Sequence, residues 1–143
     1  MNPAVKVAVC SRSFSKNPIL RTELLARYQH VTFNDVGLKL KGDSLIEFLR
    51  GHDKAIIALE TIDESILSRL PELQVISKYG VGLDMIDIAA MRTHGQRLGW
   101  AGGVNRRSVC ELVIMFAIAM LRHVPAAYRE VLSGTWLQHV GGH

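Results

Sequence analysis

Residues 73–84 read LQVISKYGVGLD, and this stretch decides the fold class. Its first six residues include the apolar Leu73 and the β-branched Val75 and Ile76, which is typical of a short buried strand. The segment 79–82 then places two glycines where a loop leaves that strand. Three similar apolar runs precede it along the chain, at residues 4–10, 30–33 and 54–59.

Helical segments separate these apolar runs. We expect helices at residues 18–27, 44–50, 63–70 and 84–93, a polar turn at 11–17 and a weaker strand at 96–100. In the last of these helices, Asp84 is the expected N-cap. Strands that alternate with helices predict a parallel sheet with helices on both faces. The sequence therefore predicts an α/β domain with an open parallel sheet over residues 1–104.

From Ser108 onward, the alternation of strands and helices gives way to one long apolar helix. Ser108 and Glu111 have the spacing of a capping box, and residues 112–121 carry no polar side chain. A helix that is apolar on every side has to be covered on every side. We therefore assign residues 105–143 to a separate helical segment. We expect a second domain or a second subunit against the helix at 108–122, so the chain is expected to form a homo-oligomer.

The composition excludes several classes of partner. The 143 residues suit one domain, and the net charge of +4 comes from 17 basic and 13 acidic residues that are scattered along the chain. No nucleic-acid partner is expected, because Arg106-Arg107 is the only basic doublet. No membrane span is expected either, since the longest apolar run is half of the roughly 20 residues required.

Two cysteines, Cys10 and Cys110, lie in apolar stretches without metal-binding spacing. We predict that both are buried free thiols, which favours a reducing compartment. The N-terminal residues do not have the pattern of a secretory signal. A cytoplasmic location is the expectation from these two observations.

The familiar motifs of nucleotide and hydrolytic enzymes are absent from the sequence. Gly80-x-Gly82 is followed by Met85 where a dinucleotide-binding loop needs a third glycine. There is no phosphate-binding loop, no nucleophile elbow and no histidine pair at metal-binding spacing. None of the six histidines adjoins a carboxylate in a dyad pattern, so we assign no catalytic residue and no metal ligand.

The glycine loop at 79–82 is the first candidate binding site. It leaves a predicted strand at the carboxyl edge of the sheet, where open α/β sheets bind ligands. Successive backbone N–H groups in such a loop form a concavity that suits a carboxylate, although the glycines alternatively serve only a tight turn. Glu60 and Thr61 follow the preceding strand and face the same edge, either to contact a substrate or as solvated loop residues.

A second candidate is the start of the long helix, at residues 103–108. The positive end of the helix dipole and the two arginines suit an anionic group, and the alternative is an ordinary helix start with solvated arginines.

Three blocks of the sequence together resemble a known family. They are SKYGVGLDxID at 77–87, GVNxRSVxEL at 103–112 and LRxxP at 121–125. In this order they resemble the D-isomer-specific 2-hydroxyacid dehydrogenases, closest to the phosphoglycerate-dehydrogenase-like branch. The resemblance implies a flavodoxin-like substrate-binding domain. It also implies NAD-dependent hydride transfer between a 2-hydroxy acid and a 2-oxo acid, with 3-phosphoglycerate or a related acid as substrate.

The resemblance also implies which residues bind. Substrate contacts are expected from Glu60, Thr61, Tyr79, Gly80, Val81, Gly82 and Asn105, and cofactor contacts from Val81 and Val109. The family's catalytic arginine, acidic residue and histidine belong to its NAD-binding domain, which is expected beyond residue 143. This chain alone is therefore expected to bind without turning over. It also has Trp100-Ala101-Gly102 where the family often has Asn-Thr-Pro, which changes one wall of the cleft.

Two other functional classes stay open. One is a naturally short, non-enzymatic binding protein that uses the cleft or the apolar helix, and the downstream coding sequence would distinguish it. The other is a flavodoxin-like or receiver-type module. A receiver needs acidic residues after the first strand, and Ser11-Arg12-Ser13 has none. A flavodoxin needs a phosphate loop at the same place, and this serine-rich turn is only a faint match to one.

Overall fold

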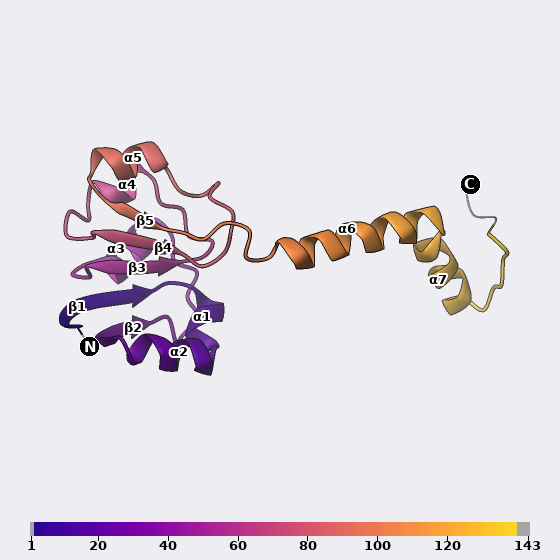
Figure 1. Cartoon of the computed structure of the whole chain (residues 1–143), viewed down its shortest axis with the longest axis horizontal. Helices are drawn as coiled ribbons and strands as arrows, with labels where there is room; N and C mark the ends of the chain where they lie inside the picture. The colour runs from indigo at the N-terminus through magenta and orange to yellow at the C-terminus, as the bar shows by residue number, and fades with distance from the viewer. Residues whose placement is uncertain (1, 140–143) are drawn as a thin grey trace. The chain divides into compact units, whose positions relative to one another are not determined.

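The computed structural model describes residues 2–139, and its centre is a five-stranded, all-parallel sheet in the order β2-β1-β3-β4-β5 (Figure 1). This is the flavodoxin-like strand order. The strands are β1 Asn2–Val9, β2 Tyr28–Phe33, β3 Lys54–Ile57, β4 Val75–Lys78 and β5 Arg97–Gly99. The predicted α/β class and parallel sheet are confirmed.

The chain divides into two units that meet between Gly102 and Gly103. The first unit holds the sheet and the helices α1 Arg12–Lys16, α2 Pro18–Leu25, α3 Asp43–Leu49, α4 Glu64–Leu67 and α5 Ile88–Thr93. The second holds α6 Arg106–Leu121 and α7 Val124–Leu132. The predicted boundary between 104 and 105, as the start of a linker to another domain, stays a prediction.

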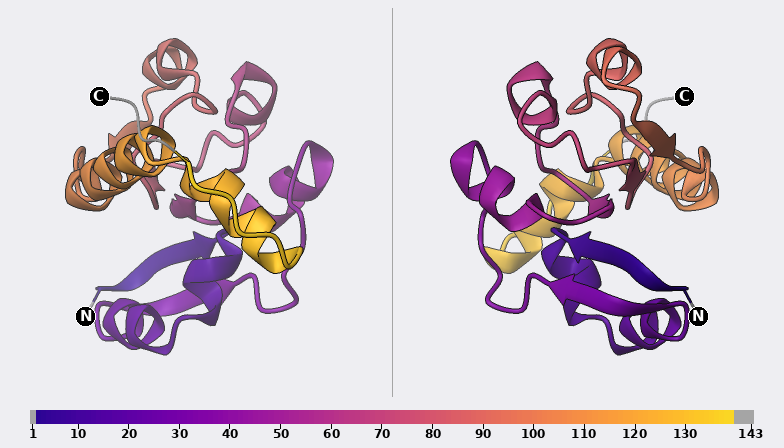
Figure 2. Two further views of the ribbon diagram at one scale, coloured as in Figure 1. Left: turned by 90° about the vertical axis from the view of Figure 1, so that its right-hand side faces the viewer. Right: turned by 90° about the vertical axis from the view of Figure 1, so that its left-hand side faces the viewer.

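Helices cover both faces of the sheet, because successive side chains of a strand point to opposite sides. On one face, Val7 and Val9 of β1 pack with Phe14 of α1 and Leu24 of α2. On the other face, Ala8 belongs to a larger cluster made mainly by α3, α4, α5 and the central strands. Figures 1 and 2 show α3, α4 and α5 following one another along the sheet, with α2 beside β2. The predicted helices on both faces are confirmed.

The segment after β1 is helical, so the prediction of a polar turn there is wrong. Ser11 caps α1, since its hydroxyl accepts the Phe14 N–H at 3.2 Å, and the Phe14 ring is buried. Asn17 then caps α2 by accepting the N–H groups of Ile19 and Leu20 at 3.0 and 3.2 Å. Two capping residues and a buried aromatic side chain thus place one short helix, α1, in the polar stretch ahead of the predicted helix α2.

The helix predicted to start at Asp84 begins four residues later, and its N-cap is Asp87. The Asp87 carboxylate accepts the Ala90 N–H at 2.9 Å. An isolated parallel bridge between Ile62 and Ile86 holds the preceding residues extended. This bridge forms between segments distant in sequence, so local capping signals could not reveal it.

The predicted capping box of the long helix is wrong. The helix α6 begins at Arg106, so Ser108 lies inside its first turn, and the Asn105 side chain makes no capping hydrogen bond. The Glu111 carboxylate instead accepts from Arg107 Nε at 2.9 Å, as an i,i+4 pair. Cys110 is exposed, so its predicted burial is wrong, whereas Cys10 is buried as predicted.

The second unit consists of α6 and α7, which contact each other, and no residue of either helix is buried. Apolar side chains such as Leu112, Ile114 and Phe116 stay exposed along α6. Between residues 2 and 139, no single helix is long and apolar enough to cross a membrane. Only α6 and α7 taken together meet that length and composition, and they are bent by 66°.

A pH-dependent stability is expected from Asp63, the N-cap of α4. Its pKa is held below the ordinary value, first by the Ser65 hydroxyl at 2.6 Å and then by backbone N–H groups including that of Ile66. A carboxyl with a depressed folded-state pKa stabilises the fold above its unfolded pKa, and this contribution is lost as pH falls through the folded pKa.

We therefore expect Asp63→Asn, which keeps a capping oxygen, to lower Tm at about pH 7 and to match the unsubstituted chain near pH 2. Thermal melts followed by circular dichroism at the two pH values measure this. A Tm difference of the same size at both would contradict it.

Candidate functional site

The glycine loop lies at the carboxyl end of β4, at the edge where the loops of the parallel strands meet. The Tyr79 N–H donates to the Ile57 carbonyl at 2.7 Å, which extends the pairing of β4 with β3 by one residue. Gly80 has φ +129°, a backbone conformation that side-chain-bearing residues rarely adopt. The loop conformation therefore requires glycine at this position.

Neighbouring loops hold the glycine loop in place. The Ile62 N–H donates to the Met85 carbonyl, and the Asp87 N–H donates to the Ile62 carbonyl, both at 2.8 Å. The Trp100 indole N–H, after β5, donates to the Val81 carbonyl at 3.0 Å. The loops after β3, β4 and β5 are thus joined by hydrogen bonds at one edge of the sheet.

The N–H groups of the glycine loop are open to a ligand. Within residues 2–139, those of Gly80, Val81 and Gly82 donate to no protein acceptor. Gly80 and Gly82 are exposed and Val81 is partly exposed, and successive unpaired backbone N–H groups of this kind can bind a small anion such as a carboxylate.

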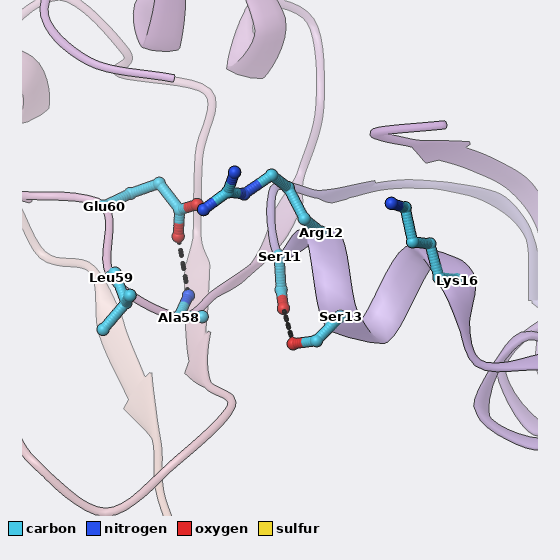
Figure 3. Close-up of a pocket in the computed structure, with 7 residues that line it drawn as sticks. All are labelled: Ser11, Arg12, Ser13, Lys16, Ala58, Leu59 and Glu60. Atoms are coloured by element: carbon cyan, nitrogen blue, oxygen red, sulfur yellow. Dashed lines mark hydrogen bonds between the residues drawn. The ribbon is translucent and has the colours of Figure 1, made fainter. Parts of the chain in front are cut away.

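A hollow of about 360 Å³ lies between the ends of β1 and β3 (Figure 3). These two strands are neighbours in the sheet but not in sequence, so the hollow occupies the topological switch point at which such sheets bind ligands. It is lined by Ser11, Arg12, Ser13, Lys16, Ala58, Leu59 and Glu60.

Two contacts join the elements that line the hollow to the elements around the glycine loop. The Phe14 ring of α1 meets the Tyr79 ring edge-on, with centroids 5.3 Å apart. On the β3 side, Lys78 Nζ donates to the Ala58 carbonyl and also contacts Met85 Sδ at 3.0 Å. The first contact joins α1 to the glycine loop, and the second joins the end of β3 to the end of β4.

Glu60 is the acidic group at the hollow. Its Oε2 accepts the Ala58 N–H at 2.7 Å. Burial lowers the pKa of the Lys78 ammonium, and the negative charges of Glu60 and Asp84 oppose that shift. Burial also raises the pKa of the Cys10 thiol, and Glu60 raises it further. Cys10 therefore stays protonated at neutral pH and is no nucleophile.

The predicted substrate contacts fall into two groups. Glu60, Thr61 and the loop 79–82 lie at one edge of the sheet, and of these only Glu60 lines the hollow. Asn105 and Val109 belong to the second unit, so their place beside the same cleft stays a prediction. None of these residues has been shown to bind a ligand, and their binding roles stay predictions.

Sequence reasoning missed four residues of the hollow, Ser11, Arg12, Ser13 and Lys16. The available signal is the serine-rich turn directly after the first strand, whose two serines flank an arginine. Its importance depends on β1 lying beside β3, and strand order is a property of the tertiary structure.

Two histidine–carboxylate pairs were also missed. His94 Nε2 lies 2.8 Å from Glu64 Oε1, and His139 Nε2 lies 2.6 Å from Glu130 Oε2. The first pair joins residues 30 positions apart, beyond the reach of a local pattern. Neither pair lines the hollow. Between residues 2 and 139, no three His, Cys, Asp or Glu side chains gather where they could hold a metal ion.

The glycine loop does not fit a dinucleotide pyrophosphate. Such a site needs glycines that open directly into a helix N-terminus. Here the Ile62–Ile86 bridge follows the glycines, and α5 starts only at Ile88. A nicotinamide cofactor would therefore need residues other than this loop to hold its phosphates.

Comparison with known proteins identifies the family. Residues 7–136 match the family described as "D-isomer specific 2-hydroxyacid dehydrogenase, catalytic domain". A glyoxylate/hydroxypyruvate reductase of Arabidopsis thaliana is 37% identical over 75 residues, which cover 52% of this chain and 23% of the relative. A D-3-phosphoglycerate dehydrogenase of Mycobacterium bovis is 32% identical over 76 residues, which cover 53% of this chain and 14% of the relative.

A solved structure agrees with these matches. The NAD⁺-bound 3-phosphoglycerate dehydrogenase of Entamoeba histolytica superposes with a TM-score of 0.67 and 26% identity, over 82% of this chain and 39% of that one. The matched region thus spans less than half of the length of each of these proteins. Since the family match covers most of its residues, the chain belongs to the D-isomer-specific 2-hydroxyacid dehydrogenase family.

Proposed function

We propose that this chain is the substrate-binding part of an NAD-dependent D-2-hydroxyacid dehydrogenase. The complete enzyme transfers a hydride between NAD(H) and C2 of a 2-hydroxy or 2-oxo acid. Relatives named for glyoxylate, hydroxypyruvate and 3-phosphoglycerate support a small acid of this class.

The open N–H groups of Gly80, Val81 and Gly82 carry this proposal. They present successive donors at the carboxyl edge of the sheet, and hydrogen bonds with the loops after β3 and β5 fix their backbone. Donors that are already oriented lose little freedom when a carboxylate binds, so a small acid can bind without a large interface. In the proposed complex the loop binds the carboxylate, which leaves C2 open to the cofactor side.

A separate domain supplies the NAD site in this proposal, because the glycine loop does not fit a pyrophosphate. Val81 and Val109 would contact the cofactor, and Asn105 would line the cleft. The NAD-binding domain, or a second subunit in a homo-oligomer, would cover the apolar helix α6. The chain by itself binds the acid and does not turn it over.

Oxamate, a small analogue of a 2-oxo acid, tests the proposal by NMR. Added to the ¹⁵N-labelled 143-residue chain, it is expected to shift the amide signals of Gly80, Val81 and Gly82. The expected Kd is on the order of millimolar, because this part forms only one side of the cleft. The amides of Gly51 and Gly95, in turns outside the site, should stay unchanged. Shifts only outside the glycine loop would refute the proposal.

The exposed apolar face of α6 leads to a further expectation. Leu112, Ile114 and Phe116 lie on a helix without buried residues, and apolar patches of this kind drive association. We expect light scattering to show a mass that rises with protein concentration, and Phe116→Lys to reduce that rise. Ile19→Lys, on α2, is the matched control for loss of an exposed apolar side chain. A monomer at every concentration would contradict the expectation.

The same helix supports a second candidate, a non-enzymatic protein that binds a partner through α6. The two candidates differ in the oxamate experiment, since the non-enzymatic protein needs no carboxylate site at the glycine loop.

A further inference from the structure

The hollow beside the glycine loop carries positive charge that no protein group pairs. Within residues 2–139, neither Arg12 nor Lys16 takes part in an ion pair. By contrast, Arg21 on the next helix pairs with Asp35 at 2.5 Å and stacks over the Phe33 ring. Arg12 and Lys16, the two cations of α1, therefore line a hollow to which the proposed function gives no role.

Two hydroxyl groups also line the hollow that Arg12 and Lys16 line. Ser11 and Ser13 line the same hollow, with their Oγ atoms 3.2 Å apart. Their mutual hydrogen bond uses one of the two hydroxyl hydrogens, so the other hydroxyl and the Arg12 guanidinium remain as donors to the oxygens of a phosphate or sulfonate. The opposing charge comes from Glu60, one of whose oxygens already accepts from the Ala58 N–H (Figure 3). The lining of the hollow therefore keeps a net positive charge.

The geometry places this hollow one step along the sheet from the proposed carboxylate site. The hollow lies at β1 and β3, and the glycine loop follows β4, so the two sites are at most two strand spacings apart, or roughly 10 Å. A three-carbon acid held at the glycine loop, with an anionic group on C3, comes within reach of the long Arg12 and Lys16 side chains. The Phe14–Tyr79 contact shows that α1 and the glycine loop are neighbours.

We propose that Arg12 and Lys16 form a subsite for a phosphate or sulfonate group on C3 of the substrate, so that the chain selects 2-hydroxy acids that carry a second anionic group. This inference rests on the proposed function, because it assumes that the carboxylate of the same molecule binds at the glycine loop. The hydroxyl of the Ser11–Ser13 pair whose hydrogen is not used in their mutual hydrogen bond completes the subsite as a donor.

The test compares three acids on the 143-residue chain by NMR titration: 3-phosphoglycerate, sulfolactate and D-glycerate. Low ionic strength is needed, because salt screens exposed charges. The phosphorylated acid is expected to bind about tenfold more tightly than glycerate, and the sulfonate in between, since charge-assisted hydrogen bonds strengthen with charge. The first acid should also shift the amides of Arg12 and Ser13.

The variant Arg12→Gln/Lys16→Gln is expected to remove the preference for 3-phosphoglycerate and to leave glycerate binding within about twofold. Arg92→Gln is the matched control, since Arg92 is an exposed cation near the end of α5 and does not line the hollow. It should keep the tenfold preference. Dispersed amide spectra of both variants establish that they are folded.

A second variant tests whether the negative charge of Glu60 weakens binding of the phosphorylated acid. Glu60→Gln removes the negative charge at the hollow and keeps an oxygen that can accept the Ala58 N–H. It is expected to strengthen 3-phosphoglycerate binding several-fold and glycerate binding much less. Unchanged 3-phosphoglycerate affinity would overturn the charge assignment of the hollow.

The outcomes distinguish a failure of the C3 subsite from a failure of the proposed function. If oxamate shifts Gly80–Gly82 but the double variant keeps the preference, or no preference exists, the subsite is refuted and the proposed function stands. If oxamate leaves those amides unchanged, the proposed function fails, and the C3 subsite fails with it.

Discussion

Replacing Ile76 with alanine is expected to destabilise the first unit by about 2–5 kcal/mol, the range for deletion of a large buried aliphatic side chain. Ile76 is fully buried in β4, where it pairs with Ala55 of β3 and Leu98 of β5 and belongs to the larger core cluster. A loss of this size is a large part of the stability of a typical domain, about 5–15 kcal/mol. Urea unfolding followed by circular dichroism measures it.

The conservative change Ile76→Val is the control, because it removes one methyl group and keeps the branched shape that suits a strand. It is expected to cost about 0.5–1.5 kcal/mol. If alanine cost no more than valine, the packing of β4 between β3 and β5 would be contradicted. The position also matters for function, since β4 leads directly into the glycine loop.

Replacing Gly80 with alanine is expected to weaken oxamate binding at least tenfold while the fold persists. A Cβ at this position would meet only Lys78 Cε, at 3.7 Å, so space is available. The cost is conformational, because alanine rarely adopts φ +129°, and it amounts to about 1–3 kcal/mol. The loop is expected to relax to another conformation in which its N–H groups no longer converge on a carboxylate.

Gly51→Ala is the matched control for backbone strain. Gly51 also has positive φ, at +73°, and a Cβ there would meet nothing within 4 Å. It lies in the turn between α3 and β3, outside the proposed site. We expect lower stability with unchanged oxamate affinity. Wild-type affinity in Gly80→Ala would show that the loop conformation is not what binds the acid.

Much of the first unit could be predicted because its signals are local. Short apolar runs rich in β-branched residues locate strands, and β4 was predicted within two residues of its observed start. The two glycines marked the loop after it, since only glycine tolerates the backbone that Gly80 adopts. The alternation of strands and helices was enough to predict a parallel sheet.

The errors arose where contacts outside the expected motif, or missing contacts, decided a local conformation. The helix predicted from Asp84 starts later because the Ile62–Ile86 bridge holds the chain extended. Ser108 fits a capping box in sequence, but Glu111 pairs with Arg107 in the folded chain. Cys110 lies in an apolar run that suggests burial, yet α6 has no buried residue. The first error thus reflects a contact distant in sequence, the second a competing pair within the same helix, and the third the absence of packing against α6.

The sequence by itself determined the α/β class and the position of the glycine loop after β4, because periodicity and glycine backbone freedom act within a few residues. Only the tertiary structure decided that β1 lies beside β3. That neighbourhood places Arg12 and Lys16 at one hollow with Glu60, next to the loop on which the proposed function rests. Strand order depends on how the strands and helices together bury both faces of the sheet, so no short sequence motif determines it.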